Sequence, residues 1–227
     1  MDEGLAKVMK DRWEDSHMQE RFQPKYPVDD VVRFVFTHFP RNPEERRNLK
    51  ILDLGCGAGA NAVFLAKEGF QTYATDISDP GLKVTEKRLK DNNLRAVVEN
   101  ASMEKQPFPD EYFDGVISFG VLYYNTADKY QNAVDEIHRI LKKDGQAFVF
   151  TRTIDDYRFG KGEKIGDNTF VLNTADTSEV GMVNFFLKRE DINRIFGKFS
   201  EIVVEKQETT FGNLQKKNSN WIIQVKK

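Results

Sequence analysis

A glycine-rich turn is the part of the sequence best suited to hold a ligand. The segment Gly55–Gly59 (GCGAG) follows the apolar run Lys50–Leu54 and precedes a helical stretch, Asn61–Lys67. Glycine allows positive φ angles and removes the Cβ atoms that would keep a ligand away. The unpaired N–H groups at the start of a helix then face that ligand. A tight turn without a ligand is the alternative, and three glycines in five residues make it the weaker one.

Two aspartates flank this turn. Asp53 lies two residues before the first glycine, and Asp76 ends the next apolar strand. Cofactors bind at the carboxyl ends of such strands. The pattern Gly55-x-Gly57-x-x-Ala60 also satisfies the dinucleotide fingerprint, with Asp76 at the distance of the residue that holds a ribose. The turn alone therefore leaves a nicotinamide or flavin dinucleotide site open.

The elements that position this turn alternate between strand and helix up to residue 151. Strands are expected at 50–54, 70–75, 95–99, 113–119 and 146–151, and helices at 28–39, 61–67, 78–91 and 130–141. This order predicts right-handed crossovers and a parallel sheet covered on both faces. After a short helix at 191–196, two alternating segments, 201–210 and 221–226, predict an antiparallel hairpin. We therefore expect an α/β fold, a three-layer Rossmann-like sandwich with a seven-stranded, mostly parallel sheet.

Composition narrows the class of protein. The 227 residues are 39% hydrophobic, which is enough for a continuous core. The net charge of −2 argues against a dedicated nucleic-acid binder. One cysteine excludes an intrachain disulfide and suits a reducing compartment. The N-terminal residues lack a secretory pattern, and no apolar run reaches the length of a membrane span, so a cytoplasmic protein is expected.

Further features distinguish the cofactor. Asp53 stands inside its strand, Pro107–Asp114 leads into the fourth strand, Ile137–Gly145 leads into the fifth, and a hairpin closes the chain. In this order the segments resemble the motifs of class I S-adenosylmethionine-dependent methyltransferases, closely over about residues 50–151. The tail around Phe185–Asp191 is similar to small-molecule methyltransferases of the tellurite-resistance type. The resemblance implies S-adenosyl-L-methionine as cofactor, S-adenosyl-L-homocysteine as product and a small-molecule O, N or S nucleophile as methyl acceptor.

The resemblance also implies a domain plan. Residues 1–49 would form an N-terminal helical lid region, and residues 50–227 the cofactor-binding domain. The polar segment at about 152–184 lacks a clear period and would be an insertion that caps the substrate.

The resemblance assigns roles around the cofactor. The backbone of the glycine turn would pass under the methionine part, with Asp53 near its cationic end. Asp76 would accept hydrogen bonds from both ribose hydroxyls, because a carboxylate offers two oxygens. Ile77 would pack on the adenine. The cofactor-binding residues implied are Asp53, Gly55, Cys56, Gly57, Gly59, Asp76, Ile77, Ser102, Met103, Phe119, Trp13 and Tyr26.

Some of these positions depart from the family or allow a second interpretation. Ser102 stands where the family places an acidic acceptor for the adenine amino group, and Glu104 is the alternative. Met103 would pack on the adenine or belong to the core. Trp13 and Tyr26 would form a lid over the cofactor or simply pack against the sheet.

The acceptor side is less defined. Tyr123, Tyr124 and Arg152 follow the fourth and fifth strands and are candidate contacts to the acceptor, although buried tyrosines often only pack. None of the three histidines adjoins a motif that would make it a base, so the sequence does not identify a general base. No cluster has metal-ligand spacing, so a catalytic metal is not expected. A nicotinamide-dependent oxidoreductase and an inactive cofactor-binding partner protein stay open as alternatives. Stable nucleic-acid and membrane binding are not expected, and the sequence does not define the oligomeric state.

Overall fold

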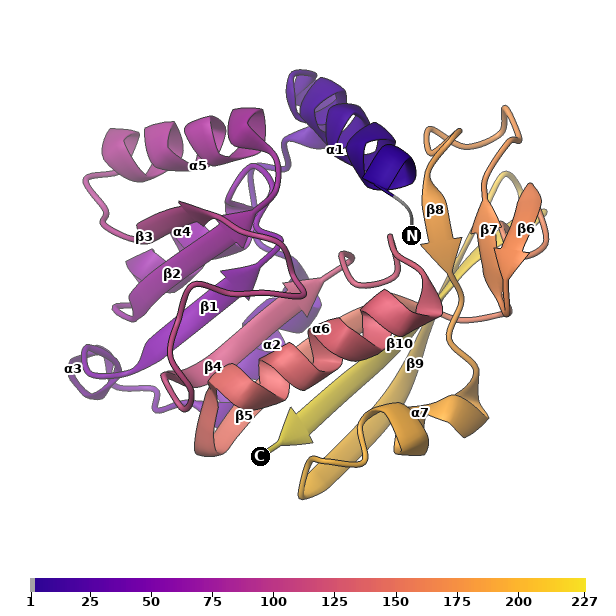
Figure 1. Ribbon diagram of the computed structural model, residues 1–227. Coiled ribbons are helices and arrows are strands. Elements are labelled where there is room, and N and C mark those ends of the chain that lie inside the picture. Colours follow the sequence, from indigo (N-terminus) through magenta and orange to yellow (C-terminus); the bar gives the residue numbers. More distant parts are fainter. Residues whose placement is uncertain (1–2) are drawn as a thin grey trace.

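A single twisted sheet organises the protein (Figure 1). The computed structural model describes residues 3–227 and contains a seven-stranded sheet in the order β3-β2-β1-β4-β5-β10-β9. The five strands β1 to β5 run parallel to one another, and β10 pairs antiparallel with both β5 and β9. The strands are β1 (Lys50–Leu54), β2 (Gln71–Asp76), β3 (Val97–Asn100), β4 (Phe113–Phe119), β5 (Leu141–Arg152), β9 (Glu201–Phe211) and β10 (Lys216–Lys226). The predicted α/β fold and its terminal hairpin are confirmed.

Helices cover both faces of the sheet because successive strand residues point to opposite sides. Leu52 and Val116 pack with α6 and α7, whereas Ile51 and Ile117 pack with α2 and α4. The helices of the two layers are α2 (Asp29–His38), α4 (Ala60–Lys67), α5 (Asp79–Asp91), α6 (Ala127–Ile140) and α7 (Arg189–Ile195). Ala74 of β2 contacts the α4 and α5 layer through Ala62 and Leu82. The result is the expected three-layer sandwich.

Element ends follow local chemistry. The Ser78 hydroxyl caps α5 by accepting from the Gly81 N–H at 3.2 Å. Strand β5 begins directly after α6, five residues earlier than expected. Its pairing with β4 is interrupted between Leu141 and Gln146, where Asp144 has φ +65°. The predicted start at residue 146 marks where regular pairing resumes.

The segment after β5 differs from the sequence prediction. Where no period was visible, a small antiparallel sheet forms from β6 (Glu163–Gly166), β7 (Thr169–Val171) and β8 (Val183–Phe185). Strands of three or four residues are too short to show alternation. The short helix α3 (Pro43–Arg46) lies between α2 and β1, where the sequence predicted no helix. We call residues 153–187, which contain the small sheet, the cap.

The N-terminal segment divides between two positions. Helix α1 (Glu3–His17) lies between α5 and the small sheet of the cap (Figure 1), and the 3-10 helix η1 (Glu20–Phe22) follows it in the chain. Met9 of α1 packs against Met182 and Val183 of the cap. Helix α2 instead packs on the main sheet, so only the first part of the proposed lid region 1–49 reaches the ligand side. Residues 1 and 2 of that region lie outside the described residues. Within residues 3–227, no helix is both long and apolar enough to cross a membrane.

Candidate functional site

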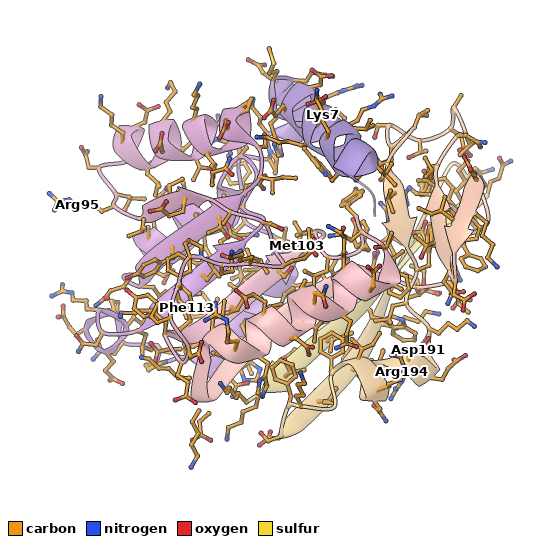
Figure 2. All side chains as sticks on the ribbon, in the orientation of Figure 1. Lys7, Arg95, Met103, Phe113, Asp191 and Arg194 are labelled. Atoms are coloured by element: carbon orange, nitrogen blue, oxygen red, sulfur yellow. The ribbon has the colours of Figure 1, made fainter. Side chains whose placement is uncertain are left out.

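A cavity of about 430 Å³ opens at the carboxyl ends of β1, β2, β3 and β4, and helix α1 roofs it. Figure 2 shows Met103 between α1 and α6, with Lys7 on the outer side of α1. The residues that line the cavity include Trp13, His17, Tyr26, Gly55, Cys56, Gly57, Asn61, Asp76, Ile77, Ser102, Met103, Glu104, Phe119, Tyr124, Asn125 and Lys129. The cavity therefore collects side chains from four successive strand ends and from the N-terminal helix.

The glycine turn has the expected backbone but an unexpected reason for its glycines. Gly55, Gly57 and Gly59 have φ angles of +73°, +50° and +78°. A Cβ atom on Gly55 would collide with Val121, and one on Gly59 would collide with Thr85. The space beside Gly55 and Gly59, which we expected a ligand to occupy, is thus filled by protein side chains. Gly59 does not line the cavity; it caps α4 in the left-handed conformation.

The Asp76 carboxylate keeps unused hydrogen-bond acceptor positions that two ribose hydroxyls could occupy. Its Oδ2 accepts from the Gly57 N–H and its Oδ1 from the Ser78 N–H, both at 2.9 Å. Each carboxylate oxygen keeps a further acceptor position. Burial raises the pKa of Asp76, while His17 and these backbone N–H groups lower it. The arrangement fits bidentate pairing with two hydroxyls, which stays a prediction.

Asp53 lies behind the turn rather than in the cavity wall. It is buried, and its Oδ2 has no hydrogen-bond partner. Burial raises its pKa to about 7, against hydrogen bonds from the Ala62 backbone and the Asn61 side chain. Asn61 does line the cavity. Any influence of Asp53 on a ligand therefore passes through Asn61 or the turn.

Cys56 shows no sign of thiol chemistry. Burial, together with Asp76 and Asp53, raises the pKa of its thiol well above the ordinary value. The buried thiol therefore stays protonated. This agrees with a residue that contributes its backbone and a small side chain.

The adenine side predicted from the sequence contains several polar groups. The Ser102 hydroxyl accepts from the Glu104 N–H at 3.3 Å, and the Glu104 carboxylate pairs with Lys129 at 2.9 Å. Asn125 donates to the Met103 sulfur at 3.2 Å, while its buried Oδ1 has no partner. An unpaired buried oxygen facing a cavity can accept from a ligand N–H.

The aromatic candidates divide between wall and core. Phe119 lines the cavity and stacks on Phe150 with ring centroids 4.4 Å apart. Tyr124 lines it and meets Trp13 edge-on at 4.6 Å. Tyr26 lies in the wall although 78% of it is exposed. Tyr123 is buried behind Tyr124 and does not line the cavity.

Arg152 has a partner that the sequence did not indicate. Its guanidinium pairs with Glu179 of the cap at 2.5 and 2.6 Å and also donates to Asn184. It lies over the Tyr123 ring, 4.3 Å from the centroid, and is itself buried. Arg152 does not line the cavity, so it supports Tyr123 from behind rather than facing an acceptor. The expected contact between Arg152 and the acceptor is not what this geometry provides.

The residues of the cavity wall that the sequence did not predict include His17, Asn61 and Asn125. A signal existed for His17. Met9, Trp13 and His17 recur every four residues, so they share one face of a helix. Asn61 and Asn125 carry no such signal, because a single amide has no recognisable pattern. Within residues 3–227, no group of three or more His, Cys, Asp or Glu side chains could hold a metal ion.

Comparison with known sequences gives a consistent result. A family model described as a methyltransferase domain matches residues 51–145. A ubiquinone/menaquinone biosynthesis C-methyltransferase of Proteus mirabilis is 33% identical over 148 residues, covering 58% of this chain and 57% of that protein. Its counterpart in Chromobacterium violaceum is 38% identical, covering 51% and 48%. The chain spans about half the length of the curated relatives it matches.

Solved structures share the fold. An S-adenosylmethionine-dependent methyltransferase of Methanosarcina mazei aligns with a TM-score of 0.71 at 17% identity, covering 86% of this chain and 96% of that one. The 1,6-didemethyltoxoflavin N1-methyltransferase of Burkholderia thailandensis, solved with S-adenosylhomocysteine, aligns with a TM-score of 0.73 at 15% identity, covering 99% and 89%. At such identities the likeness concerns the fold.

Proposed function

Because the chain belongs to the class I S-adenosylmethionine-dependent methyltransferase superfamily, we propose that it transfers a methyl group from S-adenosyl-L-methionine to a small molecule. One observation carries the proposal. A single cavity gathers the glycine turn, Asp76, the Ala101–Glu104 segment and the Phe119–Val121 segment, which follow four successive strands. Ligands of open α/β sheets bind at such strand ends.

The residues present fit an S-adenosyl cofactor. The Asp76 oxygens can accept from two ribose hydroxyls, and the Asn125 oxygen is an unused acceptor for an amino group. Ile77 and Met103 supply apolar surface for a flat base. The cavity volume of about 430 Å³ lies within the range of cofactor sites.

The cofactor supplies a methyl group already activated on a sulfonium sulfur. The protein must therefore hold the partners in line and exclude water. Helix α1 roofs the cavity, and Phe119 and Tyr124 form its wall. Burial raises the pKa of Tyr124 well above the ordinary value, so its hydroxyl stays protonated and serves as a wall or a donor rather than a base.

The acceptor is proposed to be a small molecule, because α1 roofs the cavity and Met9 of α1 packs against Met182 and Val183 of the cap. The sequence led us to expect an O, N or S nucleophile. The curated relatives are named as C-methyltransferases of quinone biosynthesis, so carbon joins these candidates. A nicotinamide-dependent oxidoreductase and an inactive partner protein find no support in the comparisons. We also propose a cytoplasmic location, since a single buried thiol suits a reducing compartment.

A methyl-transfer assay tests the proposal. The protein is incubated with methyl-labelled S-adenosylmethionine and separate pools of phenolic, quinone-precursor and N-heterocyclic compounds, and products are detected by mass spectrometry. Label in one pool with wild type, and none with Asp76→Ala, supports the proposal. Tight cofactor binding with no label in any pool or in added nucleic acid would favour the inactive partner.

A further inference from the structure

His17, the last residue of α1, sits in a notch made by two glycines. It is 7% exposed. A Cβ atom on Gly57 would lie 3.0 Å from its Nε2, and one on Gly81 would lie 2.8 Å from its Nδ1. Gly57 belongs to the cofactor turn and Gly81 to the first turn of α5. The imidazole therefore fits only because both positions lack a side chain, and it joins the N-terminal helix to the cofactor turn.

The surroundings define how the ring carries its proton. The Nδ1 atom is buried without a partner and faces the start of α5 at Gly81. The amino-terminal end of a helix carries a partial positive charge, which favours a lone pair over an N–H at this place. We assign the neutral tautomer with the proton on Nε2. Burial lowers the pKa of His17, against the attraction of Asp76, which agrees with a neutral ring.

Aromatic contacts hold the ring toward the cavity. Trp13, one helical turn before His17, lies 5.6 Å from it with the ring planes at 28°. Trp13 in turn meets Tyr124 of the cavity wall. His17, Gly57 and Asp76 line the same cavity, and the Gly57 N–H donates to Asp76. The imidazole thus stands beside the carboxylate that is proposed to hold a ribose.

We propose that His17 is a cofactor-binding residue of this site, whose Nε2–H donates to a ribose hydroxyl beside Asp76. This inference rests on the proposed function, because it requires a nucleoside in the cavity. Asp76 accepts from the ribose hydroxyls, and His17 supplies a donor to the lone pairs that those hydroxyls keep. The N-terminal helix would then close over the cofactor through a direct polar contact as well as through apolar packing.

Titration calorimetry with S-adenosylhomocysteine tests the contact. Phenylalanine keeps a ring of similar size without nitrogen, asparagine keeps a polar atom near the Nδ1 position, and glutamine keeps an amide near the Nε2 position. We expect His17→Phe and His17→Asn to weaken binding about fivefold to tenfold, and His17→Gln clearly less. His138→Phe is the matched control, since His138 lies on α6, packs against Phe199 and does not line the cavity. Melting temperatures verify that each variant is folded.

Two cofactor analogues separate a hydrogen bond from packing. S-adenosylhomocysteine lacking the 2′-hydroxyl or the 3′-hydroxyl is titrated into wild type and His17→Phe. If Nε2 donates to one hydroxyl, the penalty of the substitution disappears with the analogue that lacks it. An equal penalty for all three ligands, or no penalty at all, overturns the inference. If wild type fails to bind S-adenosylhomocysteine, the proposed function itself fails, which is a distinct result.

Discussion

The cofactor side of the cavity and the cap are built on different principles. On the cofactor side, many contacts come from the backbone, as in the turn whose N–H groups bond to the Asp76 side chain and the Thr75 carbonyl. On the cap side, a buried ion pair joins Arg152 of β5 to Glu179, and Arg158 is 3.5 Å from the same carboxylate. The first is fixed by backbone conformation and the second by charge pairing between side chains. A change on the cap side should therefore affect stability, and a change on the cofactor side should affect binding.

The largest effect is expected from Arg152→Ala. It leaves the buried Glu179 carboxylate without its main partner, so the free energy of unfolding should fall by about 3–5 kcal/mol. Urea denaturation measures this. Arg33→Ala, which removes an exposed pair with Asp29, is the control and should cost less than about 0.5 kcal/mol. Similar losses in both variants would show that the cap does not depend on this pair.

Asp76→Ala, by contrast, is expected to weaken cofactor binding more than it lowers the free energy of unfolding. Losing two hydrogen bonds to a carboxylate, worth about 1.5 kcal/mol each, should weaken S-adenosylhomocysteine binding about 100-fold. Calorimetry measures the affinity. Asp91→Ala, at the exposed end of α5, should bind as wild type does. A loss below threefold for Asp76→Ala would remove the ribose assignment.

The raised pKa of Asp53, on the cofactor side, should make the stability of the protein depend on pH. Its pKa is about 7 in the folded protein and 3.8 without the fold, so between these values the folded state binds more protons. Stability from this group is therefore complete below pH 4 and is lost as pH rises through 7. From pH 5 to 7, wild type should lose up to about 2 kcal/mol relative to Asp53→Asn. Parallel pH profiles of the two proteins, from urea denaturation, would show that Asp53 is already ionised.

Tyr124 lies where the two sides meet, and the smallest effect is expected there. Its hydroxyl lies near the Glu179 carboxylate and helps to lower the pKa of that group, so Tyr124→Phe should lower the free energy of unfolding by about 1 kcal/mol. Binding of S-adenosylhomocysteine should stay within about twofold of wild type, because the ring that lines the cavity is kept. A tenfold loss of affinity would make the hydroxyl a cofactor ligand instead.

The two sides also differ in how far the sequence predicts them. The alternation of strands and helices predicts the sheet, and the turn and Asp76 predict the cofactor side, because each follows a recognisable pattern of residue types along the chain. Arg152 and Glu179 are 27 residues apart, and nothing at either position indicates the other. The strands of the cap are too short for their pattern to be seen. The spacing of His17 from Trp13 indicates that both lie on one face of a helix. The position of His17 beside Gly57, however, depends on how α1 packs against the rest of the protein.

The central claim is that the cavity holds an S-adenosyl cofactor and not a dinucleotide, although the turn satisfies the fingerprints of both. Calorimetric titration of the wild-type protein with S-adenosylhomocysteine and, separately, with oxidised and reduced nicotinamide dinucleotide tests it most directly. We predict saturable binding of S-adenosylhomocysteine at one site per chain and no binding of either dinucleotide. Stoichiometric binding of a dinucleotide, with none of S-adenosylhomocysteine, would contradict the account.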